Sequence, residues 1–337
     1  MLYYYALLYY NINLKQINTM KKIHLISTLI GLLAFSTISK ADLKVVTSIK
    51  PIHSLASYIM DGVGSPGLIV DGYNSPHNFQ LKPSHAKMLE QADIIFWVGE
   101  DLENFLEKPL DTIAKKAEKI ELLEIKGIKK LKFRERNIFE EHDDHGHDAK
   151  KEEHEDHDDH DDHEGHGHGE YDPHIWLDPI NAKVILNEIT EHLIENDSKN
   201  ASIYKSNLAK ALAEIDKLII DVITETNTDL SYVVFHDAYQ YYENRFNVNI
   251  LGAMTVNPDV MPGAEQIHEI HEVIEHDNVS CILSEPQFNP DIIKSIAKDT
   301  NVKTGVLDPL GANLKPGKDL YLKLINKLTE GLTDCLS

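Results

Sequence analysis

Cysteine is scarce in this 337-residue chain: only Cys281 and Cys335 are present, both close to the C-terminus. In an exported protein such an even pair predicts a disulfide, and two free buried thiols are the alternative. Basic residues are also few, because 33 Lys and Arg stand against 55 Asp and Glu, which gives a formal net charge of −22. No basic patch marks a nucleic-acid-binding surface, so nucleic acid is excluded as an expected partner.

The residues after Met20 follow the pattern of a secretion signal. Two lysines come first, residues 23–35 are largely apolar, and a small-x-small tripeptide ends at Ala41. The apolar run is shorter than the roughly 20 residues that span a bilayer. We therefore expect cleavage after Ala41 and a periplasmic protein, with no nearby cysteine for lipid attachment. Residues 1–19 lie upstream of the signal, so we expect translation to start at Met20, with a longer leader from Met1 as the alternative.

Much of the negative charge is concentrated in one low-complexity segment, residues 140–171. Nine of the chain's 19 histidines lie between His142 and His168. From Glu140 to Asp172, 16 acidic residues face two lysines, so this stretch carries −14 of the net charge. No apolar residue here could form a core, and imidazole and carboxylate are ligands for divalent zinc, nickel or copper. We predict a disordered, accessory metal-collecting loop, with a solvated acidic linker as the alternative.

The rest of the chain has the pattern of an α/β protein, and its length allows two domains with a core each. Apolar runs alternate with helical patterns from Leu43 onward and again after Ser231, which predicts parallel sheets. Between them, residues 198–226 lack Pro and Gly and predict one helix about 40 Å long. We predict two lobes, each a parallel sheet flanked by helices, joined by this long rigid helix. The predicted divisions are 1–41 for the leader and signal, 42–197 for the N-terminal lobe with the loop 140–171, 198–226 for the linker helix, and 227–337 for the C-terminal lobe.

Three histidines outside the acidic segment lie where a predicted strand or turn passes into a loop. His77 precedes a predicted helix, His174 follows the acidic segment, and His236 ends a predicted strand. In open α/β sheets, ligands bind beyond the carboxyl ends of the strands. A single histidine of this kind is more often an ordinary polar residue. Together, and beside a histidine-rich loop, the three predict one metal site.

Five sequence phrases, taken in order, resemble a known family. From about Leu43 to the C-terminus, the chain is similar to the zinc-type solute-binding proteins of bacterial metal ABC transporters. The resemblance implies two lobes joined by one long helix, with Zn²⁺ held at their interface and delivered to a membrane permease. We also expect a monomer that is not an enzyme. The phrases are HNFQLKPS at 77–84, DPHIWLDP at 172–179, VVFHDAYQYYENRF at 233–246, SEPQFNP at 284–290 and VLDPLG at 306–311.

The resemblance implies a set of metal ligands, because His77, His174 and His236 fall on the positions that ligate metal in that family. Many zinc-type relatives have an acidic residue just before the first ligand, whereas this chain has Pro76. The fourth ligand is therefore open: Asp308 matches the position that manganese-type relatives use, and water is the other candidate. Those relatives carry a carboxylate at the position of His236, and three nitrogen ligands suit Zn²⁺ better than Mn²⁺.

The resemblance also bears on the histidine-rich loop and the two cysteines, whereas Asp237, His53 and His85 are judged from their own positions. The histidine-rich loop falls where zinc-type members carry a variable insertion. Cys281 and Cys335 fall where some members form a disulfide. Asp237 is a candidate for orienting the imidazole of its neighbour in the sequence. His53 and His85 are expected to cap or cover helices.

Two other functions stay open at this point. One is a manganese- or iron-binding or adhesin-type member of the same family, which a lipid anchor or a preference for Mn²⁺ would favour. The other is a secreted zinc hydrolase, which needs an open coordination position and a general base. Residues 265–276 invite comparison with the HExxH motif, but their histidines are three and five residues apart instead of four. The spacing therefore argues against protease chemistry.

Overall fold

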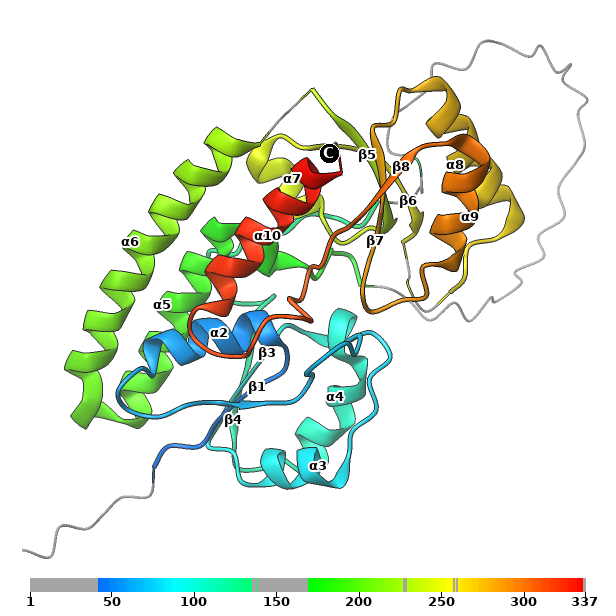
Figure 1. The fold of residues 1–337 in the computed structure, drawn as a ribbon. Helices are drawn as coiled ribbons and strands as arrows, with labels where there is room; N and C mark the ends of the chain where they lie inside the picture. The colour runs from blue at the N-terminus through cyan, green and yellow to red at the C-terminus, as the bar shows by residue number, and fades with distance from the viewer. Residues whose placement is uncertain are drawn as a thin grey trace, which may run out of the picture. The chain divides into compact units, whose positions relative to one another are not determined.

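The computed structural model describes residues 42–134, 138, 169–226, 229–256, 258 and 260–335. The expected signal at 1–41 and the predicted metal-collecting histidines at 142–168 lie outside these described residues. From Leu43 onward the chain forms one compact unit. It contains two parallel sheets with helices around them (Figure 1). Among the described helices, none combines the length and the apolar character needed to cross a bilayer.

The first sheet has four parallel strands in the order β2-β1-β3-β4. All residues of β1 and β3 are buried, as expected for parallel strands that are covered on both faces. Two of its helices begin with a proline in the first turn, where the missing N–H costs no hydrogen bond. The strands are β1 (Val45–Thr47), β2 (Gly67–Leu68), β3 (Ile94–Trp97) and β4 (Glu118–Glu121), and the helices are α2 (Lys50–Ile59), α3 (Pro83–Glu90) and α4 (Glu100–Thr112).

The second sheet repeats this arrangement with the order β6-β5-β7-β8, again with all pairs parallel. The central strand β5 lies between β6 and β7, so its C-terminal residue is buried within the unit. Helices α8 and α9 cover one face of this sheet through a separate apolar cluster. The strands are β5 (Ser231–His236), β6 (Asn249–Thr255), β7 (Cys281–Ser284) and β8 (Lys303–Val306), and the helices are α7 (Gln240–Phe246), α8 (Ala264–His276), α9 (Asp291–Thr300) and α10 (Leu320–Asp334).

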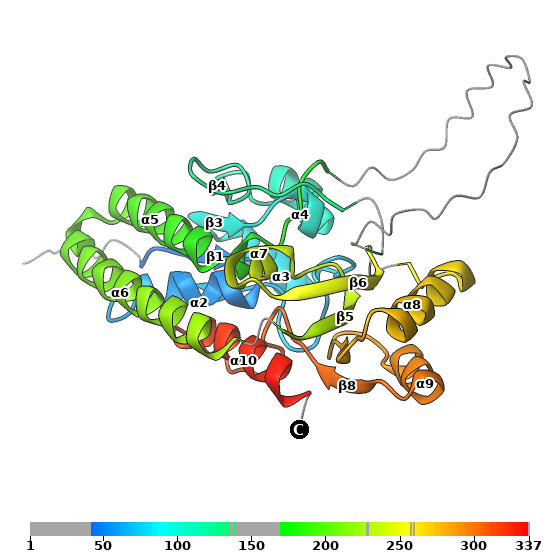
Figure 2. The ribbon, with the colours of Figure 1, turned by 90° about the horizontal axis from the view of Figure 1, so that it is seen from above.

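Two long helices link the sheets: α5 (Pro179–Asn196), which follows the 3₁₀ turn η1 (Ile175–Leu177), and α6 (Ala201–Glu225). A second 3₁₀ turn, η2 (Ser198–Asn200), precedes α6, so the long helix lies inside the predicted range 198–226. The two helices lie side by side (Figure 2). Helix α6 also contacts α2 and α10, which explains why one of its faces is buried. The predicted joining helix is therefore present, and it is packed along its length.

The C-terminal helix α10 contacts helices α2 and α6 as well as the edge strand β8 of the second sheet. Ser54 in α2 accepts a 2.8 Å hydrogen bond from the backbone N–H of Tyr321 and donates a 3.0 Å bond to the carbonyl of Lys318. Lys50 donates a 2.9 Å bond to the carbonyl of Ala312. One apolar core accordingly contains residues from both sheets. The lobe boundaries predicted from the sequence stay predictions.

The two cysteines form a disulfide that joins the second sheet to the last helix. Cys281 begins β7 and Cys335 follows α10, with 6.2 Å between their Cα atoms. The bond closes a separation of 54 residues. In the chain-entropy model, a disulfide that closes a loop of this length stabilises the folded protein by about 4 kcal/mol. The disulfide predicted from the even pair is confirmed, and it holds α10 at the edge of the sheet.

Candidate metal site

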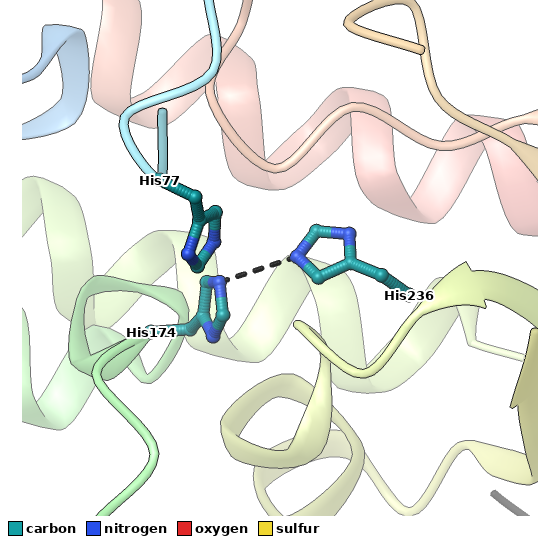
Figure 3. Close-up of side chains that lie close together, drawn as sticks. All are labelled: His77, His174 and His236. Atoms are coloured by element: carbon teal, nitrogen blue, oxygen red, sulfur yellow. Dashed lines mark hydrogen bonds between the residues drawn. The ribbon is translucent and has the colours of Figure 1, made fainter. Parts of the chain in front are cut away.

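Three histidines from distant parts of the chain converge at one point (Figure 3). One possible ligand atom from each of His77, His174 and His236 lies within 4.8 Å of the others. The Nε2 atoms of His174 and His236 are 3.4 Å apart. At a zinc–nitrogen distance of about 2.1 Å, two tetrahedral ligands are separated by about 3.4 Å. The structure therefore brings together all three histidines that the sequence predicts as ligands.

Each histidine is placed by a different local structure. His77 lies in the loop between β2 and α3, where its backbone N–H donates a 3.2 Å hydrogen bond to the Ser75 hydroxyl. His174 immediately precedes η1, and His236 is the last residue of β5. Both sheets thus contribute to the site beyond the carboxyl ends of parallel strands, as in other open α/β proteins. No single segment could form the site alone.

The site is buried on one side and reachable on the other. His174 and His236 are each 3% exposed, whereas His77 is only partly buried. The three rings line a small pocket. A cation approaching from solvent would therefore meet the His77 side first. The pocket's other lining residues are Ser75, Pro76, Trp176, Glu285, Gln287, Phe288, Pro309 and Leu310.

Buried carboxylates orient two of the three imidazoles. The Nδ1 atom of His174 lies 2.7 Å from Asp172 Oδ1, and Nδ1 of His236 lies 2.6 Å from Glu285 Oε1. When these carboxyl groups are ionised they can only accept, so each Nδ1 then carries the proton and each Nε2 presents its lone pair to the site. Asp172 also accepts a 2.9 Å bond from the backbone N–H of His174. Such partners fix the tautomer and make an imidazole a better metal ligand.

The same contacts set the protonation of the site. Burial and the nearby charge of His236 hold the pKa of His174 well below its usual value. Burial raises the pKa of Asp172 to about 7. For His236, burial alone would lower the pKa, but the charge and hydrogen bond of Glu285 outweigh it and the pKa is raised. His174 is therefore neutral and ready to ligate at neutral pH, whereas a metal must compete with a proton at His236.

The expectation that Asp237 orients His236 is wrong in this structure, because Glu285 takes that role. Asp237 instead accepts a 2.9 Å hydrogen bond from Arg134. Arg134 also forms a two-bond pair with Glu243, at 2.6 and 3.0 Å. Sequence reasoning missed Glu285 even though it lies in the SEPQFNP phrase. The available signal was its place just after a buried strand.

Asp308, the candidate fourth ligand, does not share the cluster of metal-ligand atoms found among the described residues. Its Oδ1 accepts hydrogen bonds from the Gln287 side chain (2.8 Å) and from the backbone N–H groups of Leu310 and Gly311. Its Oδ2 accepts a 2.6 Å bond from the N–H of Ala312. Asp308 thus holds the turn that supplies one wall of the pocket. As a metal ligand it stays a prediction.

Three histidines outside this site have other partners. His85 is near the start of α3, where its Nδ1 accepts a 3.2 Å bond from the backbone N–H of Lys82 and caps the helix as expected. His53 lies in α2 with its Nδ1 3.4 Å from the Ser57 hydroxyl. In α8, His268 pairs with Glu272, and within the described part of the chain no metal-ligand cluster includes the α8 histidines.

Comparisons with known proteins agree with this geometry. Residues 45–335 match the family model described as ZnuA, "Zinc-uptake complex component A periplasmic". The high-affinity zinc uptake system protein ZnuA of Brucella suis is 47% identical over 306 residues, which cover 87% of this chain and 91% of that protein. The ZnuA of Yersinia pestis is 36% identical over 310 residues, covering 91% of this chain and 95% of that one.

Solved structures show the same fold. The laminin-binding protein Lmb of Streptococcus agalactiae, described as having adhesin and metal-transporting activity, superposes with a TM-score of 0.69 at 23% identity. That match covers 88% of this chain and 99% of the other. Because the identity is low, the likeness concerns the fold alone. The family follows from the model match and from the relatives above 30% identity: the chain belongs to the ZnuA family of periplasmic zinc-uptake components.

Proposed function

We propose that this chain captures Zn²⁺ with His77, His174 and His236 and delivers it to the membrane permease of a zinc ABC transporter. The observation that carries the proposal is the convergence of three imidazoles whose possible ligand atoms lie within 4.8 Å of one another. Three nitrogen ligands with a fourth position open suit Zn²⁺ better than Mn²⁺. This chemistry favours zinc over the manganese- or iron-binding alternative.

Partial burial of the site supports reversible capture. Two ligands are fixed by Asp172 and Glu285, while His77 comes from a loop and is more exposed. A preformed pair lowers the ordering cost of binding, and the more exposed His77 lies on the side from which the ion enters and leaves. We infer that His77 joins last on capture and leaves first on delivery.

Water is favoured as the fourth ligand. Both oxygens of Asp308 already accept hydrogen bonds, four in total, so ligation would require this carboxylate to leave Gln287 and the turn at 310–312. Exchanging established hydrogen bonds for one metal bond costs part of the binding free energy. Water entering the pocket incurs no such cost.

The remaining parts of the proposal rest on the sequence patterns together with the family. The chain acts as a monomeric binding protein in the periplasm, after removal of residues 1–41. Its cargo is bound and released without chemical change, so no catalytic residue is assigned. The histidine-rich loop serves as an accessory zinc collector.

Zinc titration against a competing chelator tests this assignment. We expect one tight site in the unmodified chain, retained when residues 141–168 are deleted and lost in His77→Ala and His236→Ala. His268→Ala, which removes an exposed histidine from α8, is the matched control and should bind as the unmodified chain does. Loss of the tight site on deleting the loop would overturn the assignment. A preference for Mn²⁺ in direct competition would favour the alternative metal.

A further inference from the structure

A second group of possible metal ligands lies on the first sheet, apart from the three-histidine site. It contains Glu118, the first residue of β4, together with His192 and Glu195 on α5. One possible ligand atom from each lies within 4.8 Å of the other two. His192 is 13 residues beyond the start of α5, which corresponds to about 20 Å along the helix from the end next to His174. The two groups are therefore separate.

The contacts of His192 resemble those of the zinc-site histidines. Its Nε2 lies 3.2 Å from Glu188 Oε1, one helical turn earlier, so Glu188 can accept the ring proton and orient the imidazole. Its Nδ1 lies 2.8 Å from Glu118 Oε1, yet this buried nitrogen makes no hydrogen bond of acceptable geometry within the described structure. In this tautomer the Nδ1 lone pair faces a carboxylate oxygen 2.8 Å away, and a cation that bound both atoms would move them apart to the roughly 3.4 Å that separates two tetrahedral ligands.

The local charge also favours a cation. Glu118, Glu188 and Glu195 surround a single imidazole, and among the described residues His192 is the only ion-pair partner of Glu118 and Glu188. Glu118 is further held by a 2.9 Å hydrogen bond from Asn196 to its other oxygen. A histidine and a glutamate three residues apart on a helix project their donor atoms to the same side. Nitrogen with two carboxylate oxygens is a ligand set that zinc accepts.

We propose that Glu118, His192 and Glu195 form a second, peripheral binding site for a divalent cation of the zinc type, with Glu188 positioning the imidazole. The site is more exposed than the three-histidine site, since the side chains of Glu118 and His192 are 39% and 20% exposed. It therefore binds more weakly and exchanges freely. Ligation would tie the edge strand β4 to α5. The proposal does not depend on the function assigned to the other site.

Zinc stoichiometry in the full-length chain tests the proposal, with a chelator of micromolar affinity used to count the weaker sites. We expect His192→Ala to lose one zinc equivalent while the tight site is unchanged. Glu195→Gln, a substitution at an exposed position, should lower the zinc affinity of this second site at least tenfold. His268→Ala is the matched control, because His268 has the same four-residue pairing with a glutamate, Glu272, but belongs to no ligand group within the described chain.

A crystal of the full-length chain soaked in Zn²⁺ gives the second measurement. Anomalous scattering at the zinc edge should show a peak within bonding distance of Glu118, His192 and Glu195. Equal stoichiometry in His192→Ala and the unmodified chain would overturn the proposal. So would a crystal with zinc at the three histidines and no peak beside His192, because the cluster would then be an ion pair between a protonated imidazole and its carboxylates.

Discussion

Glu285 accepts a 2.6 Å hydrogen bond from Nδ1 of His236, and both side chains are almost fully buried. The glutamate comes from the end of β7 and the histidine from the end of β5, which is its neighbour in the sheet. This pair turns Nε2 of the imidazole toward His174. The second Glu285 oxygen is buried without a hydrogen-bond partner among the described residues, so the contact with His236 accounts for the placement of this carboxylate.

Replacing Glu285 by glutamine should weaken zinc binding about 10- to 100-fold, because the amide accepts the same hydrogen bond without the charge that makes the imidazole basic. Chelator competition at pH 7 measures the effect. Glu272→Gln is the control, since Glu272 pairs with the exposed His268 and should leave affinity unchanged. Unchanged affinity in Glu285→Gln would show that the glutamate has only a packing role.

The substitution Asp308→Asn tests whether Asp308 ligates the metal or only stabilises the turn at 310–312. The four hydrogen bonds to its carboxylate predict a loss of about 1–3 kcal/mol in the free energy of unfolding, with less than a tenfold change in zinc affinity. Urea unfolding of the metal-free chain and chelator competition give the two quantities. A loss of affinity of 100-fold or more with little loss of stability would identify Asp308 as the fourth ligand.

A buried carboxyl group in helix α4 predicts a pH effect on stability that does not involve the metal site. Burial raises the pKa of Glu103 from 4.5 to about 7. One of its oxygens accepts hydrogen bonds from the N–H groups of Val98 and Gly99, and these bonds and the Ser48 hydroxyl only partly offset the effect of burial. Because the folded-state pKa is raised, Glu103 contributes its full stability below about pH 4.5 and loses it as pH rises through about 7.

Glu103→Gln removes this titration while keeping an acceptor for the two N–H groups. Between pH 5 and pH 8 the unmodified chain should lose up to about 3 kcal/mol of unfolding free energy at this position, and the variant should not. Urea unfolding across that pH range measures the difference. Glu107→Gln, at an exposed position on the same helix, should leave the pH profile unchanged. Parallel profiles for Glu103→Gln and the unmodified chain would contradict the prediction.

Much of the fold was predictable because its signals are local. Alternating strand and helix patterns define both sheets, and the absence of Pro and Gly from 198–226 indicates α6. The three clustered histidines were found because each follows a strand or turn and matches a family motif. The packing of α10 against α2 was not predicted, because it depends on contacts between residues more than 250 positions apart.

The carboxylates around the site could not be assigned from the sequence for the same reason. Asp237 is adjacent to His236 in the sequence, but it lies just beyond the end of β5 and contacts Arg134 instead. Glu285 is 49 residues away and becomes a neighbour only because β5 and β7 pair. The turn contacts of Asp308 likewise depend on where Gln287 lies.

Arg134 connects the segment before the acidic loop to the helix that follows β5. It donates to Asp237 and forms a two-bond pair with Glu243, and both carboxylates are at least nine-tenths buried. Burial raises their pKa values to about 6 and about 7, a shift that the Arg134 charge opposes. Removing one partner of a buried ion pair leaves an uncompensated charge, which costs about 3–5 kcal/mol.

Arg134→Met should therefore lower the unfolding free energy of the metal-free chain by about 3–5 kcal/mol at pH 8, where both carboxylates are ionised. At pH 5 they can take up protons, so the loss should be smaller. Urea unfolding at the two pH values measures both. Lys130→Met is the control, because its ion pair with the exposed Glu124 is worth at most about 1 kcal/mol. An equal loss at pH 5 and pH 8 would mean that Arg134 acts through packing, and the charge of the two carboxylates would then not limit the stability of this junction.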